Sequence, residues 1–241
     1  MLITSLTNQK IKNWQKLKQK KYRELAQEFL IEGKHLLEAA LALNIVKHII
    51  TTKEYQAIYQ ADVVVSEAVF QKLALTMSGA EVIAVCRYYE SEVQDLSHVI
   101  ILDNIQDPGN VGSIIRSAVA FGYDEIFFNL GVDKYHPKLL RAAQGANFKI
   151  NITSGDVNQY LKKLTNLDFE IYLTKGTALN SYLDITIPKK IALVFGNEGQ
   201  GVSEMISNIV DSAIKIPIVT VESLNVASAA AILLSHFKKG A

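Results

Sequence analysis

Residues 191–201 read Ile-Ala-Leu-Val-Phe-Gly-Asn-Glu-Gly-Gln-Gly, an apolar run that ends in a glycine-rich turn. A strand that is apolar on both faces is typical of a parallel sheet covered by helices. The glycines let the backbone turn sharply and approach a ligand where the strand ends, which is where open parallel sheets bind their ligands. The glycine order is not that of a dinucleotide-binding turn, and no Gly-Lys-Ser/Thr follows. This turn therefore predicts neither a Rossmann cofactor nor a nucleoside triphosphate site.

Similar apolar runs recur on either side of this stretch and predict an α/β domain over residues 98–241. Its predicted strands, with helices between them, are 99–102, 125–129, 171–174, 191–195 and 213–216. Residues 1–92 predict a smaller α/β unit, joined to the first by a polar linker at 89–97. The predicted elements of the smaller unit are helices at 8–24, 32–43 and 67–74 and strands at 45–51, 62–65 and 81–86.

A second candidate segment, residues 103–118, follows the first strand of the larger domain. Asn110 is the predicted N-cap of a helix whose apolar residues recur at helical spacing. On the opposite side of that helix, Arg116 stands among small residues, which leaves its guanidinium open to an incoming phosphate. Taken alone, Arg116 also fits an ordinary surface arginine on an amphipathic helix.

The third candidate segment, residues 215–227, leads from a strand into a helix rich in Ala and Ser. Asn225 is the predicted cap of this helix. The small side chains that follow Asn225 allow close backbone packing against another element.

Together the three segments, N110-x5-R116, F195-G-N-E-G and I216-P…S-L-N225-V, resemble the three motifs of the SpoU (TrmH-type) branch of the SPOUT RNA methyltransferases. The resemblance implies a parallel α/β domain whose carboxyl-terminal stretch forms a trefoil knot, a rare exception to the absence of knots in proteins. It also implies a homodimer that uses S-adenosylmethionine to methylate a ribose 2′-hydroxyl of rRNA or tRNA. We expect rRNA, because a further domain precedes the motifs.

The resemblance assigns roles by matched position. The implied polar active-site residues are Asn110, Arg116, Glu198, Ser223 and Asn225. The implied cofactor-contacting residues are Phe195, Gly196, Ile216, Leu224 and Asn225. Between Ile216 and Asn225 the chain is one residue shorter than is common in the family and lacks a glycine, so we expect the loop around the cofactor to differ.

The amino-terminal segment carries seven cations and no acid within its first 23 residues, although the whole chain has a formal charge of only +1. Such a cluster attracts polyanions, and the interleaved Trp14 and Tyr22 are suited to stacking on unpaired bases. The alternative is a solvated helix face. The opening S-L-T-N-Q-K-I-K and the later F-L-I-E-G-K-H-L-L-E resemble the ribosomal-protein-like substrate-binding domain of rRNA-modifying relatives. The candidate RNA-binding residues are Lys10, Lys12, Lys16, Lys18, Lys20, Lys21, Arg23 and Arg141.

Composition excludes several other classes of protein. The single cysteine, Cys86, forms no internal disulfide, which fits a reducing cytoplasm, and the histidines show no metal-ligand spacing, so we expect no metal. No apolar stretch is long enough to span a bilayer. Two alternatives to an RNA methyltransferase stay open: a catalytically silent RNA-binding or ribosome-assembly factor with the same fold, and a methyltransferase acting on small molecules.

Overall fold

The computed structural model describes residues 2–76, 79–90 and 95–240. The chain forms two compact units. One contains Met1–Tyr89 together with Tyr135–Phe148, and the other contains Glu90–Lys134 and Lys149–Ala241. Part of the predicted linker, residues 91–94, lies outside the described residues. No helix in the described part of the chain is both long enough and apolar enough to cross a membrane.

The first unit is built on a five-stranded mixed sheet in the order β1-β4-β3-β5-β2. Its strands are β1 (Leu2–Ile3), β2 (Glu28–Glu32), β3 (Val46–Thr51), β4 (Val63–Val65) and β5 (Val82–Arg87). Its helices are α1 (Gln9–Lys16), α2 (Lys20–Ala26), α3 (Lys34–Ala42), α4 (Gln56–Tyr59), α5 (Glu67–Leu73) and α7 (Pro137–Ala143), with the 3-10 turn η1 (Ala146–Phe148). The helices α1 and α5 cover one face and bury Ile11, Trp14 and Phe70 against the sheet.

The structure corrects the predicted helix 8–24 of this unit and adds β1, β2 and α4, which were not predicted. The predicted helix 8–24 is two helices, because the chain leaves helical geometry at Gln19 and the buried Arg23 side chain donates to the carbonyl of Leu17, just past α1. The strand β2 was not predicted. It has only three buried residues between Glu28 and Glu32 and depends on antiparallel pairing with β5 for its geometry.

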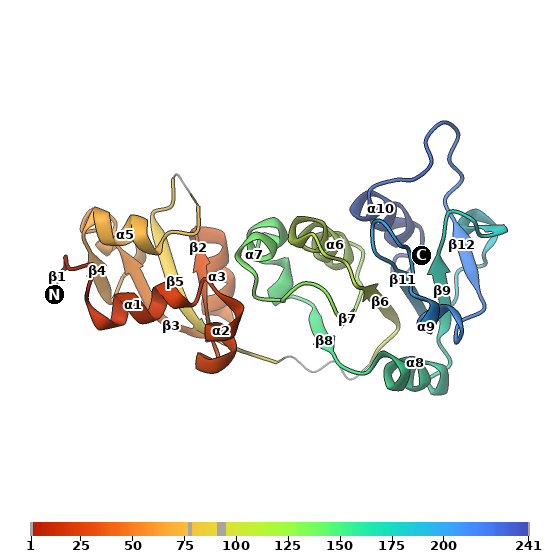
Figure 1. Cartoon of the computed structure of the whole chain (residues 1–241), viewed down its shortest axis with the longest axis horizontal. Helices are drawn as coiled ribbons and strands as arrows, with labels where there is room; N and C mark the ends of the chain where they lie inside the picture. Colours follow the sequence, from red (N-terminus) through yellow and green to blue (C-terminus); the bar gives the residue numbers. More distant parts are fainter. Residues whose placement is uncertain (1, 77–78, 91–94, 241) are drawn as a thin grey trace. The chain divides into compact units, whose positions relative to one another are not determined.

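The second unit contains a seven-stranded sheet in the order β10-β12-β9-β11-β6-β7-β8 (Figure 1). Every pairing in it is parallel, which confirms the predicted parallel sheet. Its strands are β6 (His98–Asp103), β7 (Glu125–Asn129), β8 (Asn151–Ser154), β9 (Glu170–Thr174), β10 (Asn180–Ser181), β11 (Ile191–Phe195) and β12 (Ala213–Lys215). Of these, β8 and β10 were not predicted.

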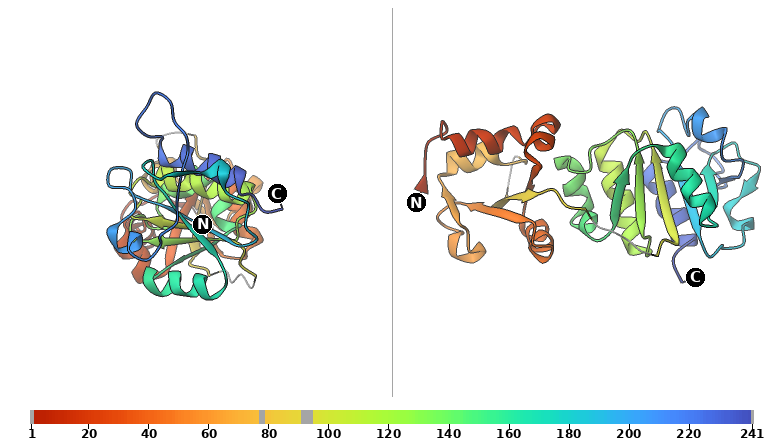
Figure 2. Two further views of the ribbon diagram at one scale, coloured as in Figure 1. Left: turned by 90° about the vertical axis from the view of Figure 1, so that its right-hand side faces the viewer. Right: turned by 90° about the horizontal axis from the view of Figure 1, so that it is seen from below.

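Helices cover both faces of this sheet (Figure 2). They are α6 (Pro108–Ala120), α8 (Val157–Asn166), α9 (Glu204–Ser207) and α10 (Val226–His236), with the 3-10 turn η2 (Tyr182–Asp184). On one face α8 and α9 bury Leu161 and Ile206 against Val99 and Ile101 of β6. On the other face α10 packs along α6. This pairing brings the amino-terminal ends of two helices together beside the carboxyl ends of β6 and β11.

Candidate active site

Hydrogen bonds join the turns that follow β6 and β11 at the carboxyl edge of the sheet. Asn197 Nδ2 donates to the carbonyl oxygen of Asn104 at 2.9 Å, and the backbone N–H of Ser203 donates to Asp103 Oδ2 at 2.7 Å. The buried Asp103 also accepts from Asn129 Nδ2 at 2.7 Å. Sequence analysis missed Asp103 and Asn129. In the sequence each could have been found as a polar residue that ends an otherwise apolar strand. In the structure they position the glycine-rich turn.

Gly196 is required by a close backbone crossing within this turn. A Cβ atom at this position would lie 2.1 Å from backbone atoms of Gly201 and Val202. The turn is closed by two hydrogen bonds of 2.9 Å between the backbone groups of Asn197 and Gly201. Any side chain at Gly196 would therefore force the turn open and move Glu198, which lies inside it.

Three predicted active-site residues from distant parts of the chain form a hydrogen-bonded series, which we call the Asn225–Asn110–Glu198 series. Asn225 Nδ2 donates to Asn110 Oδ1 at 3.1 Å, and Asn110 Nδ2 donates to Glu198 Oε1 at 3.0 Å. Each of the three side chains is hydrogen-bonded to another member of the series, although Glu198 and Asn225 are exposed. The series links the starts of α6 and α10 to the turn after β11 and leaves polar groups facing solvent.

The structure corrects the predicted helix cap in this series. Asp107, not Asn110, is the N-cap of α6, and its Oδ1 accepts from the backbone N–H of Asn110 at 2.9 Å. Pro108 occupies the first helical turn, where its missing N–H costs nothing. Because Asp107 caps the helix, the Asn110 side chain is available to the series. Asn225 is the N-cap of α10, as predicted, and accepts from Ala227 and Ser228.

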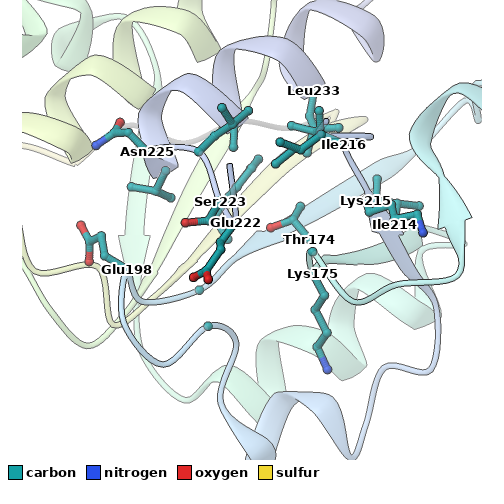
Figure 3. A pocket seen from close by; sticks show the side chains of 18 of the residues that line it. Thr174, Lys175, Glu198, Ile214, Lys215, Ile216, Glu222, Ser223, Asn225 and Leu233 are labelled. Carbon is teal, nitrogen blue, oxygen red and sulfur yellow. The ribbon is translucent and has the colours of Figure 1, made fainter. Parts of the chain in front are cut away.

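A cavity of about 390 Å³ lies beside the series (Figure 3). All five predicted cofactor-contacting residues line it: Phe195, Gly196, Ile216, Leu224 and Asn225. Of the predicted catalytic residues, Glu198 and Ser223 line it as well. Sequence analysis missed Thr174, which follows the same pattern of a polar residue at a strand end, and Glu222.

The groups that line this cavity fit S-adenosylmethionine. Its volume is within the range of small-molecule sites. Ile214, Ile216 and Leu233 give it an apolar wall suited to an adenine ring. The carboxylates of Glu198 and Glu222 suit a sulfonium cation and an ammonium group, whereas the nearby Lys175 and Lys215 suit a carboxylate. The shorter loop between Ile216 and Asn225 forms part of the wall and has no helix or strand of its own.

Arg116 lies apart from the cavity. It is exposed on α6, six residues beyond Asn110, or about 9 Å along the helix axis. Among the residues that the structure describes, none forms a hydrogen bond or ion pair with its guanidinium. The neighbouring Ser113 hydroxyl is occupied by the carbonyl of Gly109 at 3.0 Å. Arg116 therefore presents an exposed, uncommitted charge on α6, further along the helix than the polar series.

The basic amino-terminal segment divides into two groups of residues. Arg23 is buried and donates to the carbonyl of Leu17, and Lys18 Nζ donates to the carbonyls of Lys72 and Ala74 at 3.0 and 2.7 Å. Partial burial lowers the pKa of Lys18. Both cations are bound to backbone carbonyls. Arg23 and Trp14 are buried, which corrects their predicted roles in RNA binding and base stacking, whereas Lys18 is half-buried. The other predicted RNA-binding residues are exposed: Lys10, Lys12, Lys16, Lys20, Lys21 and Arg141.

Across the described residues, no cluster of three or more His, Cys, Asp or Glu side chains could hold a metal ion. Cys86 is buried in β5, and burial raises the pKa of its thiol to about 12.

Two family models match the chain. Residues 97–235 match the SpoU rRNA methylase family, and residues 8–84 match the MRM3-like substrate binding domain. This chain belongs to the SpoU rRNA methylase family. The family and fold class predicted from the three motifs are thus confirmed, and the carboxyl-terminal trefoil knot follows from family membership.

Relatives of this SpoU protein span nearly its full length. The 23S rRNA (guanosine(2553)-2′-O)-methyltransferase RlmP of Bacillus subtilis is 36% identical over 98% of both chains. A crystal structure of an RNA 2′-O ribose methyltransferase superposes with a TM-score of 0.84 at 28% identity, covering 98% of each chain. The AdoMet-bound rRNA methyltransferase of Sinorhizobium meliloti superposes with a TM-score of 0.86 at 26% identity, covering 97% of this chain and 95% of that one.

Proposed function

We propose that this protein methylates the ribose 2′-hydroxyl of a guanosine in 23S rRNA. The observation that carries the proposal is the 36% identity to the Bacillus subtilis enzyme over 98% of both chains. The likeness includes the amino-terminal unit as well as the catalytic one. A substrate that needs both units is therefore favoured over tRNA, the alternative left open by the motifs alone.

The chemistry of the chain is that of an RNA ribose 2′-O-methyltransferase that uses S-adenosylmethionine. The bound cofactor supplies a methyl group already activated by the positive sulfur. A ribose hydroxyl is a poor nucleophile near neutral pH, so the protein has to hold it in line with that methyl and allow its proton to leave. The predicted activity and methyl donor are confirmed.

In this proposal the polar series positions the ribose. The Asn225–Asn110–Glu198 series fixes the start of α10 and the glycine-rich turn relative to each other. It thereby sets the distance between the cavity and the incoming sugar. Glu198 and Glu222 place negative charge at the cavity wall, which favours a cationic ligand.

Arg116 holds the phosphate next to the target ribose. Its planar guanidinium donates two parallel hydrogen bonds to phosphate oxygens and carries a permanent charge. A group this basic is a poor acceptor for the hydroxyl proton, so we assign it positioning and not proton removal. Its support is the exposed, uncommitted guanidinium on α6.

Residues 1–92 act as the RNA substrate-binding domain and residues 98–241 as the catalytic domain in this proposal. The match to a substrate binding domain and the exposed Lys10, Lys12 and Lys21 support the first assignment. The enzyme works as a homodimer in the cytoplasm. Apolar side chains left exposed near the carboxyl terminus support the dimer, since Val219 is 97% exposed and Val221 57%.

Comparing ribose-methylation maps of ribosomal RNA from cells with and without this protein tests the proposal. We expect one guanosine of 23S rRNA to lose its 2′-O-methyl group. Loss of a 2′-O-methyl group from a tRNA instead would identify tRNA as the substrate. Unchanged maps, together with no calorimetric binding of S-adenosylmethionine by the folded protein, would favour the silent assembly factor.

A further inference from the structure

A second cavity, of about 370 Å³, lies in the first unit and is lined by residues of α1, α2, β2 and β3. All the residues that line it belong to that unit. It is separate in sequence and in lining from the cofactor cavity. Its walls combine positive charge, an aromatic ring and hydrogen-bonding groups, and no role has yet been assigned to it.

The charge of this cavity is positive. Lys10 and Lys16 line it and are exposed, and the Lys16 ammonium lies 5.5 Å from the centroid of the Tyr22 ring. The acidic residue on its wall, Glu28, is paired with Lys47. The two lysines therefore give the cavity a net attraction for phosphate.

The remaining wall fits a flat aromatic ligand. Tyr22 is half-buried in the wall, and Leu25 lies beside it with 79% of its surface exposed. An exposed leucine next to an aromatic ring offers an apolar surface on which a base can rest. Stacking of a base on an aromatic side chain contributes about 1–3 kcal/mol and tolerates any base.

Two polar groups on the wall are free to bond to a base edge. His48 Nδ1 lies 2.7 Å from Asp62 Oδ2, and because a carboxylate only accepts, the proton is on Nδ1 and Nε2 is an acceptor in the neutral ring. Asn13 Oδ1 accepts from Gln9 at 2.9 Å, which leaves its Nδ2 as a donor. Every base offers both donors and acceptors on its edges, so we expect little base selectivity.

We propose that this cavity binds one unpaired nucleotide of the RNA, with the base on Tyr22 and Leu25 and the phosphate at Lys10 and Lys16. The inference rests on the proposed function, in that RNA is the substrate. It adds a specific nucleotide site, distant in sequence from the methyl-transfer residues. This site would hold a nucleotide other than the one that is methylated.

Fluorescence of a single-stranded RNA of about twelve nucleotides, with one 2-aminopurine, tests the site on the full-length protein. Stacking on Tyr22 should quench the fluorophore on binding. Tyr22→Leu should abolish the quenching and weaken binding on the order of tenfold without changing its salt dependence, because no charge is removed. Tyr22→Phe should keep both properties.

The matched control is Tyr55→Leu, since Tyr55 is a half-buried tyrosine of the same unit outside the cavity. It should change binding less than twofold. A second pair covers the case in which Tyr22→Leu does not fold. Leu25→Glu on the cavity rim should weaken binding several-fold more than Ile58→Glu, which makes the same charge change at a residue 68% exposed on α4.

Equal effects of Tyr22→Leu and Tyr55→Leu, or quenching that survives Tyr22→Leu, would overturn the nucleotide site. Such a result would leave wild-type methyl transfer to 23S rRNA intact. Failure of the proposed function is a different result, because the wild-type protein would then transfer no methyl group to 23S rRNA while Tyr22-dependent quenching persisted.

Discussion

The two units of this protein use their polar side chains in different ways. In the unit with the parallel sheet, Asn110, Glu198 and Asn225 bond mainly to one another at the carboxyl edge, where Glu198 and Asn225 are exposed and Asn110 is half-buried. In the unit with the mixed sheet, Lys18 and Arg23 bond to backbone carbonyls and support the fold. Some polar residues that follow parallel strands are thus left facing solvent, where a ligand can bind, whereas the cations of the amino-terminal segment divide between supporting the fold and facing solvent.

The largest effect is expected at Arg116, where a substitution should lower the rate of methyl transfer but not the stability. Arg116→Ala should lower the single-turnover rate of methyl transfer on the order of 100-fold or more, the range seen when a positioned electrostatic group is deleted. The free energy of unfolding should change by no more than about 0.5 kcal/mol, because the side chain is exposed. Arg116→Lys should restore part of the rate, since lysine lacks the planar fork. A stable Arg116→Ala protein with near-normal turnover would remove Arg116 from the site.

The second effect is expected in the other unit, where replacing a buried arginine should lower stability. Arg23→Met keeps the apolar stem but leaves the carbonyl of Leu17 without its buried donor, which should cost about 2 kcal/mol of unfolding free energy. Chemical denaturation measures it. The control Lys21→Met changes an exposed cation two residues earlier and should stay within about 0.5 kcal/mol. If the two variants were equally stable, Arg23 would not be the structural cation that we describe.

A third, smaller effect tests which lysines of the basic amino-terminal segment bind RNA and which support the fold. Lys12→Gln with Lys21→Gln should lower the slope of log K against log salt for RNA by roughly 1.5, since each phosphate that is no longer neutralised reduces it by about 0.7–0.9. Lys18→Gln should leave that slope nearly unchanged, because its ammonium is bound to the carbonyls of Lys72 and Ala74. A slope unchanged by the double variant would make the exposed lysines a solvated face only.

The smallest effect concerns an ion pair that maintains the fold in the parallel-sheet unit. Burial alone would raise the pKa of Asp124, but hydrogen bonds from Lys239, Ser97 and His98 outweigh it and lower that pKa. A lowered carboxyl pKa stabilises the fold above the unfolded pKa of about 3.9, and this stability is lost as pH falls through the folded pKa. Lys239→Gln should therefore destabilise by no more than about 1 kcal/mol at pH 7, since Lys239 is half-exposed. The difference in melting temperature between Lys239→Gln and the wild type should therefore shrink as the pH falls below about 3.9, and a difference that stays constant with pH would contradict this.

Much of the parallel sheet was predictable, because apolar runs and the turns that end them are local in sequence. The strands β7 and β11 have the predicted bounds. The strands β1, β8 and β10 escaped prediction because each is short and depends on pairing with another strand. The strand β2 escaped because glutamates at both its ends leave only three apolar residues between them. The break after Leu17 also escaped, since it depends on where the Arg23 side chain turns.

The site was predictable as a set of residues but not as a set of contacts. Motif spacing placed Asn110, Glu198 and Asn225 at the ends of three strands, whereas the hydrogen bonds that join them need the packing of α10 on α6. The roles of Asp107 and Asp103 were missed for the same reason. Each acts through a partner that only the folded backbone brings near.

Methyl transfer to ribosomal RNA from cells lacking this protein tests the central claim most directly. Purified protein, 23S rRNA and S-adenosylmethionine labelled in its methyl group are incubated, and the RNA is digested to nucleosides for mass spectrometry. The account predicts label in 2′-O-methylguanosine, approaching one methyl group for each 23S rRNA. Label on a base, or no transfer by folded protein that binds S-adenosylmethionine, would contradict it.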